Sequence, residues 1–194
     1  DEEFLAMIKE RIAKKDRPNM WFNPQAGTAA SSREDWDDPL LRDTISPQQI
    51  QAQVGEQLAR MTPESVERAR RTLREAGEKS HLKLRAAGMK IVLGGDTGQT
   101  RFFIGWSQQL EFENWVRMGL TPSEAIVAAT RDSAIAGHFN TGMVAAGKYA
   151  DMILIDGDPT RDITDINKID TTIKGGKVYD PVKIEAALGI LPRR

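Results

Sequence analysis

The segment Met89–Gly98 constrains the fold more than any other part of this sequence. It begins with the apolar run Met89–Leu93, which lacks strict alternation, and continues as Gly94-Gly95-Asp96-Thr97-Gly98. A short run of this kind is typical of a strand that is buried on both faces, as in a parallel sheet. The preceding residues have a helical pattern that ends at Gly88. Helix, glycine turn, buried strand and acidic loop in this order indicate an α/β fold, and a βα barrel in particular.

Further helices are predicted before this strand. Apolar residues at helical spacing predict a helix over residues 2–15, and an aromatic run at residues 19–23 predicts a short buried strand after it. Ser46 and Thr62 each precede a proline, and we expect them to cap the starts of two more helices. The second of these helices contains Gly77, which is expected to weaken its middle.

The predicted elements change from helices to strands towards the C-terminus. The expected helices cover residues 107–118, 121–129 and 131–137, and the expected strands cover Met152–Ile155 and Thr171–Lys174. Thr121-Pro122-Ser123-Glu124 has the form of a capping box, and Gly175-Gly176 has the form of a hairpin turn. The change falls at about residue 141, so we predict a division of the chain into residues 1–140 and 141–194.

Composition excludes several classes of function. The chain has 194 residues and a formal net charge of −1, so it lacks the basic character of nucleic-acid-binding domains. It has no Cys, which excludes disulfides, thiolate metal ligands and a cysteine nucleophile. Its apolar runs are shorter than the roughly 20 residues that span a bilayer. We therefore expect neither a nucleic-acid nor a membrane partner. The sequence begins with Asp1, which suggests a fragment or a processed product, and the compartment is unknown.

Asp96 is the candidate catalytic residue, because it follows the predicted buried strand directly. In parallel α/β folds the C-terminal ends of the strands face the active site. The flanking glycines allow the backbone to approach a ligand closely. The alternative is that Asp96 caps a helix or stabilises a turn. A phosphate-binding P-loop is excluded, because no Lys follows the glycines.

Several segments follow Asp96 in a characteristic order. They are Leu110–Glu113, Met118–Ile126, Ala128–Thr130 with Ala134, Gly142–Asp156, and Pro159 with Ile173–Val178. Together with the Gly-Gly-Asp-Thr-Gly string, they resemble the amidohydrolase superfamily, especially its imidazolonepropionase-like and prolidase-like branch. The resemblance covers roughly residues 85–180. Residues 1–24 fit the preceding helix–strand unit of that family more loosely, and residues 25–62 resemble no part of it.

The resemblance implies the C-terminal part of a (β/α)8 TIM-like barrel, followed by part of a small composite β domain. Residues 1–140 then form the last strands and helices of the barrel, with an insertion at about residues 25–62. Residues 24–45 within it show no periodicity and predict a long loop. Residues 141–194 form the C-terminal part of the β domain. Strands that precede the barrel complete this domain in the family, so the expected partner is a missing N-terminal segment or a partner chain.

The resemblance also implies a divalent metal, zinc, in the complete enzyme. The family's site uses an HxH pair, a bridging Lys or Glu, two further His and an Asp. Asp96 matches the Asp, which implies that it is both a metal ligand and the group that takes a proton from the attacking water and passes it to the leaving nitrogen. The two His, His81 and His138, match no ligand position. Because a catalytic zinc needs about three protein ligands, we expect no metal in the isolated chain.

Two functions are compatible with these patterns. The first is a fragment of a metal-dependent hydrolase that acts on carbon–nitrogen bonds other than ordinary peptide bonds. Its small-molecule substrates would be cyclic amides or dipeptide-like compounds, and the isolated chain would be inactive. The alternative is a non-catalytic truncated product or interaction module that retains only the C-terminal part of the fold.

Aromatic and basic residues after Asp96 have two interpretations. Phe102, Phe103, Trp106 and Trp115 are candidates to line a substrate pocket, with packing in the core as the alternative for Trp115. Arg101 is a candidate to bind a substrate carboxylate, although a solvated loop arginine is the commoner case. Trp115 is expected in the core.

Overall fold

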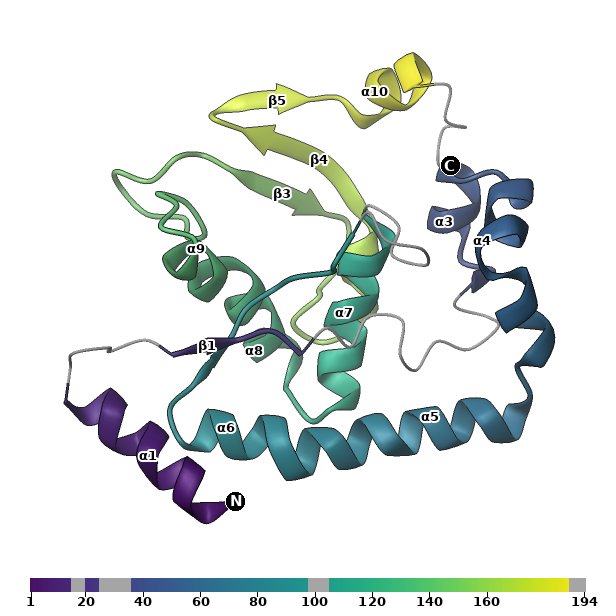
Figure 1. Ribbon diagram of the computed structural model, residues 1–194. Coiled ribbons are helices and arrows are strands. Elements are labelled where there is room, and N and C mark those ends of the chain that lie inside the picture. The colour runs from purple at the N-terminus through teal and green to yellow at the C-terminus, as the bar shows by residue number, and fades with distance from the viewer. Residues whose placement is uncertain (15–19, 25–35, 98–104, 189–194) are drawn as a thin grey trace.

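The structure, a computed structural model, describes residues 1–14, 20–24, 36–97 and 105–188. Figure 1 shows helices surrounding a pair of strands, with a separate three-stranded sheet along one side. The helices are α1 (Glu2–Ala13), α3 (Pro39–Thr44), α4 (Pro47–Arg60), α5 (Pro63–Ala76), the π-helix η1 (Gly77–His81), α6 (Leu82–Ala86), α7 (Trp106–Arg117), α8 (Pro122–Val127), the π-helix η2 (Ala128–Asp132), α9 (Ser133–Ala136), the 3-10 helix η3 (Ile163–Asn167) and α10 (Pro181–Leu188). The strands are β1 (Trp21–Phe22), β2 (Lys90–Ile91), β3 (Met152–Ile155), β4 (Ile169–Lys174) and β5 (Lys177–Tyr179). The α/β class is therefore confirmed.

Strands β1 and β2 pair in parallel, with Phe22 opposite Ile91. The backbone pairing extends past β2, since the N–H of Val92 donates to the Phe22 carbonyl over 3.0 Å. The predicted parallel arrangement of the two strands is confirmed, although both are shorter than predicted. The prediction that the strand over Met89–Leu93 is buried on both faces is only partly correct. Ile91 is buried, whereas Val92 and Leu93 are half-buried. Among the described residues β2 has a neighbouring strand on one edge only, which explains the incomplete burial.

Helices α5, η1 and α6 form one long helical rod, as Figure 1 shows. It begins at Thr62, whose side chain accepts from the Ser65 N–H, and Gly88 follows its end with a φ of +100°. Both predicted ends are confirmed. At Gly77 the rod widens into the π-helix η1. A Cβ atom at Gly77 would lie 2.8 Å from the Met118 carbonyl oxygen, so the glycine allows the end of α7 to approach the rod closely.

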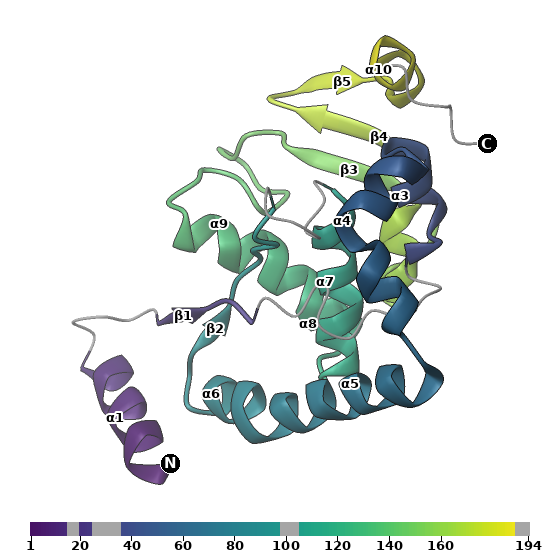
Figure 2. The same ribbon diagram turned by 45° about the vertical axis from the view of Figure 1, so that its right-hand side comes forward.

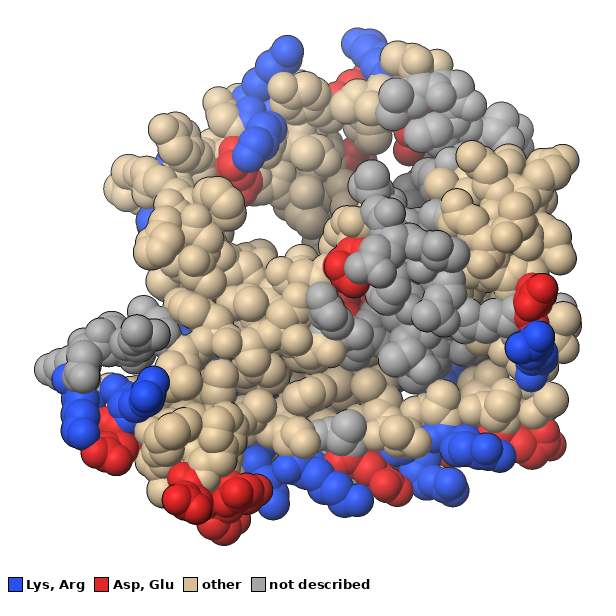
Figure 3. All heavy atoms as spheres, in the orientation of Figure 1, with Lys and Arg blue, Asp and Glu red and all other residues tan. Residues whose placement is uncertain are grey.

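The outer face of α5 is charged. Figure 3 shows Lys, Arg, Asp and Glu side chains along the edge of the molecule that α5 forms. They form surface ion pairs over 3.5–3.9 Å, namely Arg71–Glu75, Arg74–Glu67 and Lys79–Glu75. Exposed pairs of this kind contribute little to stability, so this face is an ordinary solvated surface.

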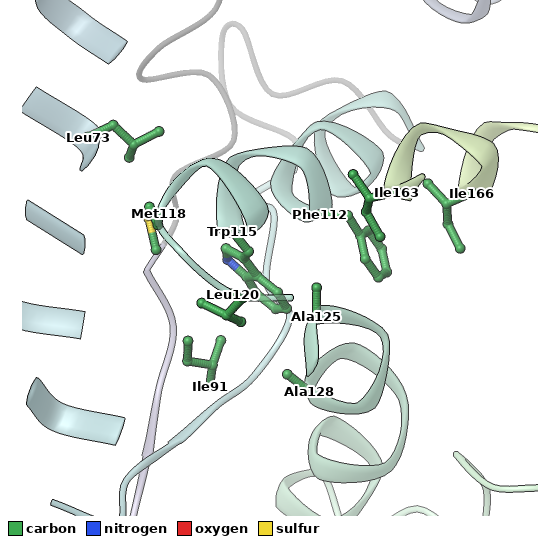
Figure 4. Close-up of a cluster of buried hydrophobic side chains, with 10 residues drawn as sticks. All are labelled: Leu73, Ile91, Phe112, Trp115, Met118, Leu120, Ala125, Ala128, Ile163 and Ile166. Atoms are coloured by element: carbon green, nitrogen blue, oxygen red, sulfur yellow. The ribbon is translucent and has the colours of Figure 1, made fainter. Parts of the chain in front are cut away.

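The main hydrophobic core surrounds α7. Figure 4 shows side chains from the α5 rod, β2, α7, α8 and η3 pointing towards one another. Trp115 lies in this cluster and is fully buried, which confirms its predicted position in the core. The buried members are Leu73, Ile91, Phe112, Trp115, Met118, Leu120, Ala125, Ala128, Ile163 and Ile166.

A second core joins α3 and α4 to the start of α7. Its buried members are Trp36, Leu41, Ile50, Val54, Trp106 and Leu110. The prediction of a loop over residues 24–45 is wrong for α3, which covers Pro39–Thr44. Leu41 and Trp36 are buried against residues distant in the sequence, and this packing stabilises a helix that the local periodicity does not indicate. Residues 25–35 lie outside the described part of the chain.

Helices α8, η2 and α9 follow one another without a break. The predicted capping box is confirmed, since Thr121 and Glu124 bond each other's backbone N–H groups. The helix that the sequence predicts over residues 131–137 ends at Ala136, and His138 follows it. His138 has a φ of +57°, and the next N–H, that of Phe139, donates to the Ala134 carbonyl over 2.8 Å. This pattern is typical of a helix terminus in which the chain turns through the left-handed region.

The C-terminal sheet has the antiparallel order β3-β4-β5, and Figure 2 shows it beside α9 and α10. The predicted hairpin is confirmed, with φ values of +57° and +79° at Gly175 and Gly176. Asp151 supports the turn by accepting from the Gly175 N–H over 2.7 Å and from the Lys174 ammonium. The domain division at about residue 141 stays a prediction. Within the described ranges, the helices lack the length and apolar character needed to cross a bilayer.

Candidate functional site

Asp96 lies beyond the C-terminal end of β2, and its side chain is exposed. Its backbone has a φ of +47°. This left-handed conformation is uncommon for residues other than glycine, although Asp adopts it more readily than most. Asp96 therefore occupies a sharp bend at the end of the strand. Its catalytic role stays a prediction.

Two neighbouring glycines lie against side chains from other elements. The Asn23 side-chain amide, just after β1, donates to the Gly94 carbonyl over 3.1 Å, and a Cβ atom on Gly94 would lie 2.0 Å from that nitrogen. A Cβ atom on Gly95 would lie 3.2 Å from the Gln108 side chain on α7. The sequence predicted a close approach of this backbone to a ligand. The close approach in the structure is to Asn23 and Gln108.

The other edge of the strand end contacts Ser133. The Leu93 N–H donates to the Ser133 hydroxyl over 2.8 Å, and this hydroxyl donates to the Ala128 carbonyl over 2.8 Å. Sequence reasoning did not identify Asn23, Gln108 or Ser133. Their contacts join residues up to 71 positions apart, so no local pattern in the sequence marks them.

The two His residues lie in different environments. His81 is in η1, half-buried, with its ring 5.7 Å from the Phe22 ring. Burial lowers the pKa of His81, because desolvation disfavours the charged imidazolium. His138 is exposed after α9. Among the residues that the structure describes, no three His, Asp or Glu side chains are grouped as metal ligands. Asp96 is the one metal ligand that the sequence suggests. The described residues therefore do not provide enough ligands to bind a metal ion by themselves.

The aromatic residues after Asp96 are partly core residues. Trp106 is 1% exposed and packs against Trp36, so it is a core residue. Phe102, Phe103 and Arg101 lie outside the described residues.

A pocket of about 440 Å³ lies at the start of β2, at the end of the strand opposite to Asp96. Three basic and two acidic side chains line it, and they form ion pairs with one another. The pairs are Arg85–Glu124 at 2.8 Å, Lys90–Asp132 at 3.6 Å and Arg131–Asp132 at 2.9 Å. These contacts join α6, β2, α8 and η2, so the charged residues of this pocket connect elements of the fold.

The family model described as "Amidohydrolase family" matches residues 49–179. The match begins well before residue 85, where the sequence resemblance was placed, and includes α5 and most of α4. The expectation that residues 25–62 resemble no part of the family is therefore wrong from residue 49 onwards. No curated protein sequence matches the chain.

Solved structures of the same fold include a bottromycin amidohydrolase, with a TM-score of 0.65 and 19% identity over 88% of this chain and 40% of that one. A Xaa-Pro dipeptidase with bound methionine has a TM-score of 0.54 and 24% identity, over 93% of this chain and 37% of that one. A further amidohydrolase has a TM-score of 0.51 and 20% identity, over 89% and 36%. The chain thus spans about two fifths or less of the length of these proteins. Since the family model covers more than half of the sequence, the chain belongs to the amidohydrolase family.

Proposed function

We propose that this chain is part of a metal-dependent hydrolase that acts on carbon–nitrogen bonds other than ordinary peptide bonds. Family membership supports hydrolysis. Two proteins of similar fold are named as an amidohydrolase of bottromycin and as a Xaa-Pro dipeptidase, which supports cyclic-amide or dipeptide-like substrates. The observation that carries the proposal is the position of Asp96, exposed after the end of a parallel strand and within the matched region.

Asp96 is the proposed catalytic residue and one proposed ligand of a divalent metal, zinc. When bound, such a metal polarises the substrate carbonyl and makes water more acidic. A carboxylate oxygen of Asp96 accepts a proton from the attacking water as the new carbon–oxygen bond forms. The same carboxyl group then donates this proton to the nitrogen as the carbon–nitrogen bond breaks. The proton thus returns to the leaving group, and Asp96 ends as the carboxylate with which it began.

The proposed architecture is the end of a (β/α)8 barrel, with β1 and β2 as its last two strands and β3–β5 as part of a small β domain. The parallel pairing of β1 with β2 supports this arrangement. The other metal ligands and the other strands would come from an N-terminal segment or a partner chain. The chain's coverage of 36–40% of the structures of similar fold supports a longer protein.

The gene provides the first test. An HxH motif encoded in the same reading frame about 200 residues upstream of Asp1 is expected, because a complete barrel has about 250 residues. If the gene and its neighbours encode no such motif, the chain is the non-catalytic module.

The second test is the Asp96→Asn variant of the complete protein. This change removes the base and keeps the size of the side chain, so kcat should fall by about 100-fold or more while KM changes less. Asp156→Asn, at an exposed aspartate after β3, is the matched control and should retain full turnover. If Asp96 only stabilises a turn, the variant should lose about 1 kcal/mol of stability and keep its kcat, which would refute the catalytic role.

A further inference from the structure

The end of β2 is held on the edge that has no neighbouring strand among the described residues. Alternate N–H groups of a strand point to opposite edges. Those of Lys90 and Val92 donate to the Met20 and Phe22 carbonyls on the β1 side. That of Leu93 points away from β1 and donates to the Ser133 hydroxyl over 2.8 Å. The Ser133 hydroxyl therefore satisfies an N–H just past the end of β2, on the side away from β1. Because it also donates to the Ala128 carbonyl, this hydroxyl connects the end of β2 to η2.

On the β1 side, Asn23 contacts the next residue, Gly94. The Asn23 side chain donates to the Gly94 carbonyl over 3.1 Å. Gly94 and Asn23 are so close that a Cβ atom on Gly94 would displace the Asn23 amide. The φ of Gly94 is not in the left-handed region, so an alanine there meets a steric obstacle in Asn23 and no backbone strain.

Gln108 holds the far side of the bend. Its side-chain nitrogen lies 3.4 Å from the Thr97 hydroxyl, and its side-chain oxygen accepts from the Gly105 N–H over 3.0 Å. The same side chain thus contacts the residues on both sides of the 98–104 interval. Its aliphatic part lies 3.3 Å from the position of a Cβ atom on Gly95.

We propose that Ser133, Asn23 and Gln108 are positioning residues that together fix the backbone of residues 93–97 and so orient the Asp96 carboxylate. The contacts come from three separate elements, η2–α9, β1 and α7, and they surround the bend at Asp96. An exposed carboxylate on a bend with a φ of +47° needs such support, since a catalytic group acts only when it is held in its productive geometry. The catalytic part of this proposal rests on the proposed function of Asp96.

Amide hydrogen exchange in the 194-residue chain tests the Ser133 contact. In Ser133→Ala, the Leu93 amide should exchange about fivefold faster, the factor that a net hydrogen bond of about 1 kcal/mol represents. The NMR chemical shifts of Gly94, Gly95 and Asp96 should also change. Ser133→Thr keeps the hydroxyl and should restore the protection of Leu93.

Thr130→Ala is the matched control for this experiment. Thr130 lies in η2, three residues before Ser133. Its hydroxyl donates to the Ile126 carbonyl over 2.7 Å and not to β2. It should leave the Leu93 exchange and the Asp96 signals unchanged. Equal effects of Ser133→Ala and Thr130→Ala, or no effect of Ser133→Ala, would overturn the role of Ser133.

A double-mutant cycle tests the second contact independently of Ser133. Gly94→Ala alone should shift the Asp96 signals, because the new methyl group displaces the Asn23 amide. In an Asn23→Ala background the obstacle is absent, so adding Gly94→Ala should shift the Asp96 signals by much less. Additive effects of the two substitutions would show that Asn23 does not position the bend.

The kinetic consequence is measured in the complete hydrolase. Ser133→Ala should lower kcat with little change in KM, and Ser133→Thr should restore kcat. If Asp96→Asn leaves turnover intact while the exchange results are as expected, the proposed function fails and the structural support of the bend stands. If Asp96→Asn abolishes turnover but Ser133→Ala alters neither exchange nor kcat, the positioning role fails and the proposed function stands.

Discussion

The Trp36 indole packs against the Trp106 indole, with ring centroids 4.8 Å apart and planes inclined by 44°. Trp106 is the first residue of α7 and Trp36 precedes α3. This contact attaches α3 and α4 to the start of α7. The described residues from Trp36 to the end of α4 are therefore packed against the rest of the fold through this second core.

Trp36→Ala should destabilise the chain strongly. The side chain is 2% exposed, and removing a buried tryptophan of this kind costs about 3–5 kcal/mol. The free energy of unfolding measured in urea is the appropriate readout. Trp21→Ala is the control, because Trp21 is only half-buried in β1 and should lose clearly less. An equal loss in the two variants would contradict the packing role of Trp36.

Glu124 should make stability depend on pH. Its carboxylate accepts from the Thr121 N–H and from the Arg85 guanidinium, both over 2.8 Å, and these contacts lower the pKa of Glu124 from 4.5 to about 2. A lowered pKa in the folded state stabilises the fold above pH 4.5, and this contribution is lost as the pH falls towards 2. The Glu124→Gln variant should thus be less stable than the parent at pH 7 and similar to it near pH 2.

The size of this difference is limited by solvent. The Glu124 side chain is 44% exposed, so we expect about 1 kcal/mol at pH 7. Gln49→Ala is the control, because Gln49 completes the capping box of α4 without a charge. Its effect should be the same at both pH values. A Glu124→Gln effect that does not change with pH would contradict the ionic contribution.

Gly77→Ala and Gly55→Ala should have opposite effects, although both glycines are helical. Alanine favours a helix over glycine by about 1 kcal/mol. At Gly77 the new methyl group would meet the Met118 backbone at 2.8 Å, and overpacking of this kind costs about 1–3 kcal/mol. At Gly55 it would meet only the end of the Gln51 side chain, which can move. Melting temperatures should therefore fall for Gly77→Ala and rise for Gly55→Ala, and a rise in both would refute the close contact with α7.

The isolated 194-residue chain should bind no stoichiometric zinc at neutral pH. A catalytic zinc site uses about three protein ligands, and the described residues contain no group of three. Metal analysis after dialysis measures this directly. One zinc retained per chain would contradict the expectation and would point to ligands that we have not identified.

The local sequence determined the starts of α4, α5 and α8, the end of α6 and the hairpin. Ser46, Thr62 and Thr121 form capping boxes where the sequence predicts them, and Gly88 adopts the positive φ expected after a helix. The Gly175-Gly176 turn is also correct. These features depend on contacts within about four residues, so the residue types at those positions are sufficient to predict them.

Tertiary structure decided what local patterns do not encode. Helix α3 depends on the burial of Leu41 beside distant residues, and the short extent of β2 depends on which strands lie beside it. For the candidate site, the sequence indicated Asp96 and its glycines, whereas the positions of Ser133 and Asn23 follow from how η2 and β1 pack on either edge of β2. The Leu93–Ser133 and Asn23–Gly94 hydrogen bonds join residues 40 and 71 positions apart. They form only after folding brings these elements together. Since Ser and Asn side chains can bond many different groups, their residue types do not predict these partners.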